Sequence, residues 1–281
     1  MRLSRPRRSY MQGVLSSLPP GAVCMITGEI VRYAQSMQAL HALVAPNGSF
    51  LSWHMGMLVA RSINDAFAVV MEKPELQWAW IMGDDHTYSP DIVMKLIERD
   101  KDVVMPLCLN RVPPMDPTIV EWDAEHKTRR LKPLEDMPTS GLYKLAINET
   151  CGDAGMLIRR HVIEKSGPKW YERMKSGSHQ AEDDEFVTKL KMLGFDIHVD
   201  LDNRIGHIGA VDFRPALVDG KWVVRCIGAG FRQVADLKVG SRKWKGPLPE
   251  RPNSGIVQPI GNGNGALPER ELEGNMVTGE V

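Results

Sequence analysis

The sequence predicts an α/β fold built on a mostly parallel sheet. Through the first 107 residues, short apolar runs alternate with segments whose apolar residues recur at helical spacing. The run Trp78 to Met82 is too short for an ordinary helix and contains two Trp, which predicts a buried strand. An alternation of strands and helices favours parallel strands with helices on both faces of the sheet.

The elements follow from apolar spacing and from turn residues. For the third helix, Ser89 is the predicted N-cap, with Pro90 and Asp91 in its first turn. In the first half we expect strands at 22–26, 49–53, 78–82 and 102–107, and helices at 33–44, 58–71 and from Pro90. In the second half we expect a polar hairpin at 119–131, strands at 143–147, 156–158 and 195–201, helices at 160–165 and 182–194, and a hairpin at 211–226 around Asp219-Gly220.

Composition shifts suggest the domain organisation. Residues 1–20 are basic and punctuated by proline, which predicts a flexible segment. Residues 21–245 are expected to form a single domain, with a first half at 21–109 and a second half at 110–245 that contains a smaller antiparallel portion. Residues 246–281 are rich in Gly and Pro and predict a flexible tail.

Composition also limits the class of function. The chain has 281 residues, 43% hydrophobic and 25% charged, as in soluble globular proteins. Thirty-five basic and 35 acidic residues balance, so no net field favours nucleic acid as a partner. No run is long and apolar enough to span a bilayer, and no apolar stretch after the basic start makes a signal peptide. The four cysteines are scattered without a CxxC pair, which predicts buried thiols and a cytoplasmic location.

The pair Asp84-Asp85 followed by His86 is the first candidate for chemistry. It ends the predicted Trp78 strand, and the carboxyl edge of an α/β sheet is where such sheets bind ligands. Adjacent carboxylates at that edge can hold a divalent cation, which can in turn hold a phosphate. The alternative is a solvated turn with a capping acid.

Two further features have both a functional and a structural interpretation. The run Glu182 to Glu185 places four acids in the first turn of a helix, which its macrodipole alone would favour. Clustered like charges also repel, so one carboxyl could have a raised pKa and act as a base. His207, in a predicted loop beyond the 195–201 strand, could reach the same sheet edge or be merely structural.

From about Ala22 to Gly209, the chain resembles glycosyltransferases of the GT-A fold, in particular the inverting, family-2-like branch. The resemblance rests on the order of several weak motifs. These are Arg61-Ser62-Ile63-Asn64, Gly83-Asp84-Asp85-His86 (similar to the DxD region), Gly152-Asp153-Ala154-Gly155 leading into Met156 to Arg160, Glu182-Asp183-x-x-Phe186, and His207. Gly83 stands where relatives have the first Asp of that region, so a ribose contact made there is lost or passes to Asp84.

The resemblance implies a GT-A type, Rossmann-like sheet and a hexosyltransferase-like enzyme that uses Mn²⁺ or Mg²⁺. Asp85 and His207 would bind the metal, and Asp183, with Glu182 beside it, would be the catalytic base. The donor would be a nucleotide-diphosphate sugar, with UDP-sugars favoured, and the acceptor a hydroxyl of a saccharide or another molecule. Inversion is expected, with retention as the alternative. The implied donor contacts are Thr27, Arg61, Asn64, Asp84 and Arg111, and the implied acceptor-side residues are Gly152, Asp153, Gly155 and Trp170.

Two other classes of function stay open. A metal-dependent nucleotidyltransferase also places acids beside an α/β sheet, although Ile26 to Glu29 lacks the Gly-rich, basic loop that such enzymes show after their first strand. The second class is a non-catalytic relative that binds a nucleotide-sugar or a carbohydrate. No P-loop or dinucleotide fingerprint is present.

Overall fold

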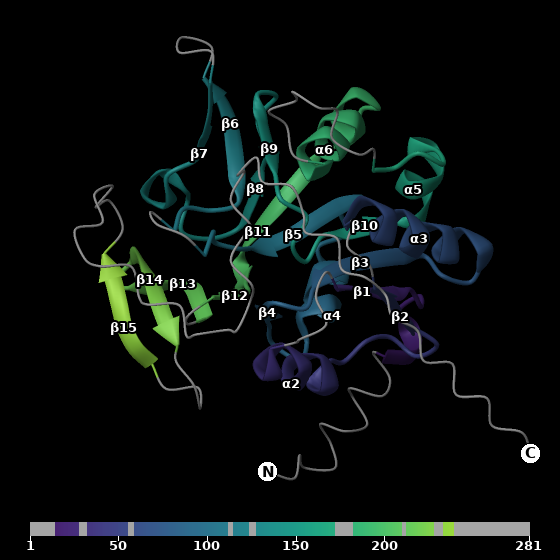
Figure 1. The fold of residues 1–281 in the computed structure, drawn as a ribbon, viewed down its shortest axis with the longest axis horizontal. Helices are drawn as coiled ribbons and strands as arrows, with labels where there is room; N and C mark the ends of the chain where they lie inside the picture. Colours follow the sequence, from purple (N-terminus) through teal and green to yellow (C-terminus); the bar gives the residue numbers. More distant parts are fainter. Residues whose placement is uncertain are drawn as a thin grey trace, which may run out of the picture. The chain divides into compact units, whose positions relative to one another are not determined.

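A seven-stranded mixed sheet organises the protein (Figure 1). The computed structural model describes residues 15–27, 33–55, 59–111, 115–123, 128–171, 182–209, 212–227 and 233–238. The strand order is β2-β1-β3-β10-β5-β11-β8, in which β10 and β8 run against the other strands. The strands are β1 (Ala22–Thr27), β2 (Phe50–Met55), β3 (Trp78–Gly83), β5 (Val103–Leu107), β8 (Leu142–Lys144), β10 (Leu157–Arg159) and β11 (Ile197–Arg204). The predicted α/β class with a mostly parallel sheet is confirmed.

The alternation of side chains along the strands divides the core into two hydrophobic clusters. Trp78, Trp80 and Met82 of β3 belong to one cluster, which includes residues of α4 and is packed by residues of α2. Ala79 and Ile81 belong to the other, with residues of α3, α5 and α6. The helices are α2 (Ala34–Ala42), α3 (Val59–Glu72), α4 (Ile92–Glu98), α5 (Arg160–Ser166) and α6 (Glu182–Met192), and a short 3₁₀ helix η1 spans Leu134–Asp136.

The start of α4 differs from the prediction. The helix begins at Ile92, and its N-cap residue is Asp91, whose side chain makes no capping hydrogen bond. Instead, the Asp91 carboxylate lies 3.1 Å from Lys95 Nζ, one turn further along. The predicted N-cap at Ser89 is wrong because the chain first forms a short strand, β4 (His86–Thr87), which delays the helix.

A second, five-stranded sheet contains this short strand, in the order β15-β14-β13-β12-β4. Its other members are β12 (Gly206–Ile208), β13 (Asp212–Val218), β14 (Lys221–Ile227) and β15 (Gln233–Lys238). The predicted hairpin is confirmed, since Asp219 and Gly220 have φ angles of 51° and 71°, as a tight hairpin turn requires. The predicted loop at His207 is wrong, because this residue lies on β12.

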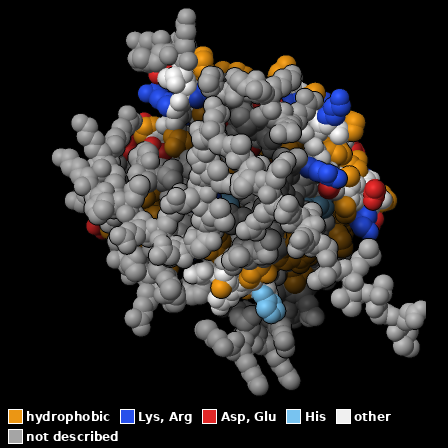
Figure 2. Space-filling model, in the orientation of Figure 1, with side chains coloured by type: hydrophobic (Ala, Val, Ile, Leu, Met, Phe, Trp, Pro, Cys, Tyr) orange, Lys and Arg blue, Asp and Glu red, His pale blue; other side chains and the backbone are white. Residues whose placement is uncertain are grey.

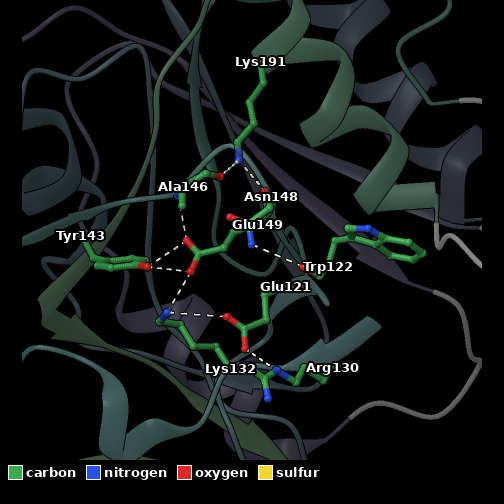
Figure 3. Close-up of polar contacts among 9 residues, drawn as sticks. All are labelled: Glu121, Trp122, Arg130, Lys132, Tyr143, Ala146, Asn148, Glu149 and Lys191. Carbon is green, nitrogen blue, oxygen red and sulfur yellow. Dashed lines mark hydrogen bonds and ion pairs between the residues drawn. The ribbon is translucent and has the colours of Figure 1, made fainter. Parts of the chain in front are cut away.

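A third sheet, in the order β7-β6-β9, contains the predicted polar hairpin. Its strands are β6 (Ile119–Asp123), β7 (Thr128–Leu131) and β9 (Glu149–Cys151). Glu149 is buried at 2% exposure, and its carboxylate accepts hydrogen bonds from Lys132, from the Tyr143 hydroxyl and from the Ala146 amide (Figure 3). Lys191 of α6 donates to the Ala146 and Glu149 carbonyls. This network fixes β9, and with it the start of the 152–155 segment, against α6.

The described surface and cysteines agree with the predictions from composition. On the face drawn in Figure 2, the visible basic and acidic side chains are intermixed and do not form a patch of one sign. All four cysteines are buried. Among the helices in the described ranges, none is both long and apolar enough to cross a bilayer. Residues 1–14 and 239–281 lie outside the described residues, so the flexible start and tail stay predictions.

Candidate functional site

The pairing of β4 with β12 brings two histidines face to face. His86 and His207 are direct partners in the antiparallel register, and their rings are stacked with centroids 4.4 Å apart. The link continues beyond the ring pair, because the Ile208 amide donates to the Asp85 carbonyl over 2.7 Å. Residues more than a hundred positions apart thereby meet at the carboxyl edge of β3, where α/β sheets bind ligands.

Asp85 lies against both imidazoles. Its Oδ1 is 2.8 Å from His86 Nδ1, and its Oδ2 is 3.2 Å from His207 Nε2. Burial alone would raise the pKa of Asp85, but hydrogen bonds with His207 and His86 outweigh it and hold the pKa below the usual range. The lowered pKa favours the ionised form of the Asp85 carboxylate at neutral pH. The structure thus brings together the two residues expected to bind a metal.

Arg111, an expected donor contact, also reaches this carboxylate. Its guanidinium donates to Asp85 Oδ2 over 2.7 Å, and its side chain remains 45% exposed. A cation bound at the same oxygen would have to share it with Arg111 or displace it. Gly83 makes room for the arrangement, because a Cβ there would come within 2.9 Å of Asp85 Oδ1 and 3.1 Å of His86 Nδ1. The glycine at position 83 therefore has a steric reason.

Cys108 completes a cluster that the sequence interpretation missed. One ligand atom each from His86, Cys108 and His207 lies within 4.8 Å of the others. Both ring nitrogens of His86 are buried and have no hydrogen-bond partner among the described residues, which is costly for polar atoms unless a ligand binds them. Imidazole and thiolate are ligands of divalent transition metals, so the residues present fit such an ion. Cys108 directly follows the apolar run of β5, and this position was the signal that could have identified it.

Asp183 is the acidic group with the chemistry expected of a base. It lies in the first turn of α6, and its Oδ2 is 3.4 Å from the position of a Cβ on Gly152. Burial, together with the charges of Asp153 and Asp184, raises the pKa of Asp183 from 3.8 to about 7. A carboxyl group with this pKa can both accept and release a proton near neutral pH.

Gly152, which lies beside Asp183, is connected to Cys108 near the histidine pair through two backbone hydrogen bonds. The Gly152 amide donates to the Thr118 carbonyl over 2.8 Å, and the Thr118 amide donates to the Cys108 carbonyl over 3.0 Å. At the other end of the segment, Gly155 has a φ of 74° and would bring a Cβ to 2.8 Å from Pro106. The close approach and the positive φ explain a glycine there. The 152–155 segment, expected on the acceptor side, therefore runs across the ends of the strands that carry the site.

Two expected sugar or donor contacts have structural roles. The Asn64 side chain is clamped to the backbone of Tyr171, donating to its carbonyl over 2.7 Å and accepting from its amide over 2.9 Å. Trp170 is 9% exposed, packs edge-on against Phe67 and donates its indole N–H to the Ile163 carbonyl. The structure thus shows Trp170 as a core residue, so stacking on an acceptor sugar has no support here.

The remaining expected residues are placed as follows. Arg61 is 80% exposed on α3, with its nearest carboxylate 4.0 Å away at Asp65. Thr27 is buried at the end of β1, and Asp84 lies in the turn between β3 and β4. The side chain of Glu182 lies outside the described residues. A ligand role for these residues stays a prediction.

Gly206 provides a test of the strand that carries His207. A Cβ at this position would lie 1.7 Å from Asp212 Oδ1 and 2.4 Å from Thr87 Oγ1, so these side chains or the strands that carry them must shift. We expect Gly206→Ala to lower the free energy of unfolding by about 1–3 kcal/mol or more, measured by urea denaturation. Gly209→Ala is the matched control, because a Cβ there meets its nearest neighbour, Phe213, at an ordinary 3.5 Å. Equal denaturation midpoints for the two variants would contradict the described packing of β12.

Comparisons with known proteins leave the family open. No protein-family model matches the chain, and no curated protein matches it. Among solved structures, A197 from STIV is 12% identical with a TM-score of 0.41, over 78% of this chain and 94% of that one. GalNAc-T7, solved with UDP, GalNAc and Mn²⁺, is 12% identical with a TM-score of 0.48, over 73% of this chain but 45% of that one. Similarity this low does not indicate a function, and the evidence for one comes from the residues of the candidate site.

Proposed function

We propose that the protein is a metal-dependent glycosyltransferase with a GT-A type fold. It moves a sugar from a nucleotide-diphosphate donor, with UDP-sugars favoured, to a hydroxyl group of a saccharide or another acceptor. The observation that supports this proposal is a short backbone connection between two groups. Asp85 lies against His86 and His207. Gly152, which lies beside the Asp183 carboxyl with its pKa of about 7, is joined by backbone hydrogen bonds through Thr118 to Cys108, which lies close to both histidines.

Sugar transfer needs both a group that holds a metal ion and a group that acts as a base. A divalent ion such as Mn²⁺ or Mg²⁺ held by Asp85 and His207 would neutralise the charge of the departing diphosphate. Arg111, adjacent to Asp85, can add a guanidinium to the same diphosphate, which suits its planar pair of donors. Asp183 would take the proton of the acceptor hydroxyl as that oxygen bonds to the anomeric carbon and the bond to the diphosphate breaks. Attack opposite the leaving group inverts the configuration.

The other expected contacts remain part of this proposal. On the donor side they are Thr27, Arg61, Asn64 and Asp84, and on the acceptor side Gly152, Asp153 and Gly155. For Asn64 a positioning role is better supported, because both ends of its amide are bound to Tyr171. Glu182 stays beside Asp183 as the second acid of its motif.

One observation favours a second candidate, a non-catalytic nucleotide-sugar-binding protein. The Asp85 carboxylate already has a cationic partner in Arg111 at 2.7 Å, which competes with a metal for Oδ2. A protein that binds a diphosphate through Arg111 alone would not need a metal. This candidate predicts donor binding that is independent of divalent ions.

A thermal-shift screen with UDP-, GDP-, dTDP- and CMP-sugars, each with and without Mn²⁺, separates the two candidates. A ligand that binds the native state raises the melting temperature by mass action. We expect one donor to raise it only when Mn²⁺ is present, and mass spectrometry to show donor hydrolysis or transfer under the same conditions. A metal-independent shift without turnover would support the binding protein, and no shift with any donor would refute both.

A further inference from the structure

We propose that Cys108 is a thiolate ligand of the metal and that, with His86 and His207, it forms a site for Zn²⁺ or a similar ion such as Co²⁺. The proposal deepens the function above, and it rests on that function only for the role of the ion. It assigns the ion of the proposed function to two nitrogens and one sulfur, with Cys108 and His86 joining His207 in place of Asp85, and so favours Zn²⁺ or Co²⁺ over Mn²⁺ or Mg²⁺.

The first argument is the hydrogen bonding of the two histidines. The Leu109 carbonyl, which can only accept, lies 2.9 Å from His207 Nδ1, so this nitrogen carries the proton. In the neutral ring the lone pair is then on Nε2, which faces Asp85 Oδ2 at 3.2 Å. Two acceptors that close repel each other unless a proton or a metal cation lies with them. A proton or a metal cation is therefore needed at His207 Nε2 to relieve its repulsion with Asp85 Oδ2.

His86 is oriented in the same way. Its Nδ1 lies 2.8 Å from Asp85 Oδ1, within ion-pair distance, but neither ring nitrogen of His86 has a hydrogen-bond partner among the described residues. His86 is 5% exposed, so its Nε2 is a buried nitrogen that is available to a metal. A carboxylate beside the other ring nitrogen of a metal-binding histidine is a recurrent arrangement in metal sites. Asp85 thus has a positioning role here and is not itself required as a ligand.

Cys108 supplies the third atom. It is 1% exposed at the end of β5, and its thiol donates a long hydrogen bond, 3.6 Å, to the Leu109 carbonyl. Its sulfur and one ring nitrogen of each histidine lie within 4.8 Å of one another. Metal–nitrogen bonds of about 2.0–2.1 Å and a metal–sulfur bond of about 2.3 Å place tetrahedral ligands roughly 3.5 Å apart, so the side chains need to close in by about 1 Å. Side-chain rotation of this size does not require the strands to move.

The ligand set determines the kind of ion. A thiolate with two imidazoles suits Zn²⁺ and Co²⁺, whereas Mg²⁺ and Mn²⁺ suit carboxylate, carbonyl and water oxygens. Three protein ligands leave a position open for a phosphate oxygen or water, as in catalytic rather than structural zinc sites. The thiol proton is released to solvent when the metal binds.

Titration of the metal-free, full-length chain with Co²⁺ tests this proposal by absorption spectroscopy. We expect the visible bands of tetrahedral cobalt and a thiolate-to-cobalt charge-transfer band in the near ultraviolet. Cys108→Ser should lose the charge-transfer band and weaken Zn²⁺ binding, measured by competition, by more than about 100-fold, since residues that merely orient ligands already account for about 10–100-fold. Cys24→Ser is the matched control, because Cys24 is equally buried but lies on β1, outside the cluster.

The spectrum of the wild-type protein tests thiolate binding to the metal even if Cys108→Ser fails to fold. Cobalt bound without a charge-transfer band would overturn the role of Cys108 and leave the proposed glycosyltransferase intact. No binding of Co²⁺ or Zn²⁺ at all would also overturn it. A charge-transfer band in a protein that neither binds nor turns over any nucleotide-sugar would instead uphold the metal site and refute the proposed function.

Discussion

Replacing Asp183 with Asn is expected to lower sugar transfer by about 10²–10⁴-fold while leaving donor binding in place. The amide cannot take the proton of an acceptor hydroxyl, and positioned general bases contribute a rate factor of about that size. Asn is nearly isosteric with Asp and its side-chain oxygen can still accept the hydrogen bond that the Asp184 amide donates over 2.9 Å. The measurement is turnover at saturating donor, beside the melting-temperature shift with the same donor.

The pKa of Asp183 adds a prediction about pH. Because the base must be ionised, transfer should rise with pH through about 7, where the structure places the pKa. Stability should change in the opposite direction. The folded pKa lies above the ordinary 3.8, so folding favours the protonated form, and the resulting stability is lost as the pH rises from about 4 through 7. Asp183→Asn removes this loss.

The comparison of melting temperatures therefore distinguishes a catalytic from a structural Asp183. We expect the Asn variant to be as stable as the wild type or more stable at pH 8, with a smaller advantage at pH 5. A variant that loses both activity and stability at pH 8 would show that Asp183 mainly holds α6 in place. Asp196→Asn is a suitable control, because Asp196 is exposed and pairs with Lys144 well outside the site.

The sheet was predictable because its strands carry strong local patterns. Apolar runs such as Trp78 to Met82 are bounded by turn residues, and their neighbours repeat at helical spacing. Four strands were not predicted: β4, β9, β12 and β15. The first three are only two or three residues long, whereas β15 has six residues. Strands of two or three residues show no alternation and depend on their pairing, as β12 does on β4 and β13. The short strand β4 also explains the wrong N-cap prediction at Ser89, because the helix begins later than the sequence pattern indicates.

The candidate site was predictable in part for a related reason. Asp85 and His207 stood out because polar residues at strand ends meet at one sheet edge. Cys108 also follows a strand, but a single cysteine without a CxxC partner has no metal-binding signature in the sequence. The role of Trp170 could not be decided from the sequence, since an aromatic residue near an expected acceptor site has the same sequence signature as a core residue. Only the packing against Phe67 distinguishes them.

Replacing Arg129 with Met is expected to destabilise the protein by about 3–5 kcal/mol. Arg129 of β7 makes a short ion pair with Asp184, which is 5% exposed and otherwise accepts one hydrogen bond, from Thr150 over 2.6 Å. Removing the guanidinium leaves a buried, uncompensated carboxylate, which is the costly way to break a buried pair. Urea denaturation measures the loss.

The adjacent Arg130 is the matched control. It pairs with Glu121 at 2.6 Å, but its side chain is 56% exposed, so Arg130→Met should cost less than about 1 kcal/mol. If both variants lose the same small free energy of unfolding, the Arg129–Asp184 pair stabilises the protein no more than an exposed ion pair does. A double variant, Arg129→Met with Asp184→Leu, should recover part of the loss, since no unpaired charge remains.

The same substitution should also change the chemistry of the site, because Asp184 directly follows Asp183. The Asp184 charge already raises the pKa of Asp183, and without Arg129 it would be less neutralised. Transfer by Arg129→Met should therefore rise with pH at a higher value than in the wild type, while transfer by Arg130→Met should not shift. An unchanged pH profile in a folded Arg129→Met protein would mean that the Arg129–Asp184 pair has no influence on the pKa of Asp183. The clustered acids at the start of α6 would then serve the helix macrodipole and not the reaction.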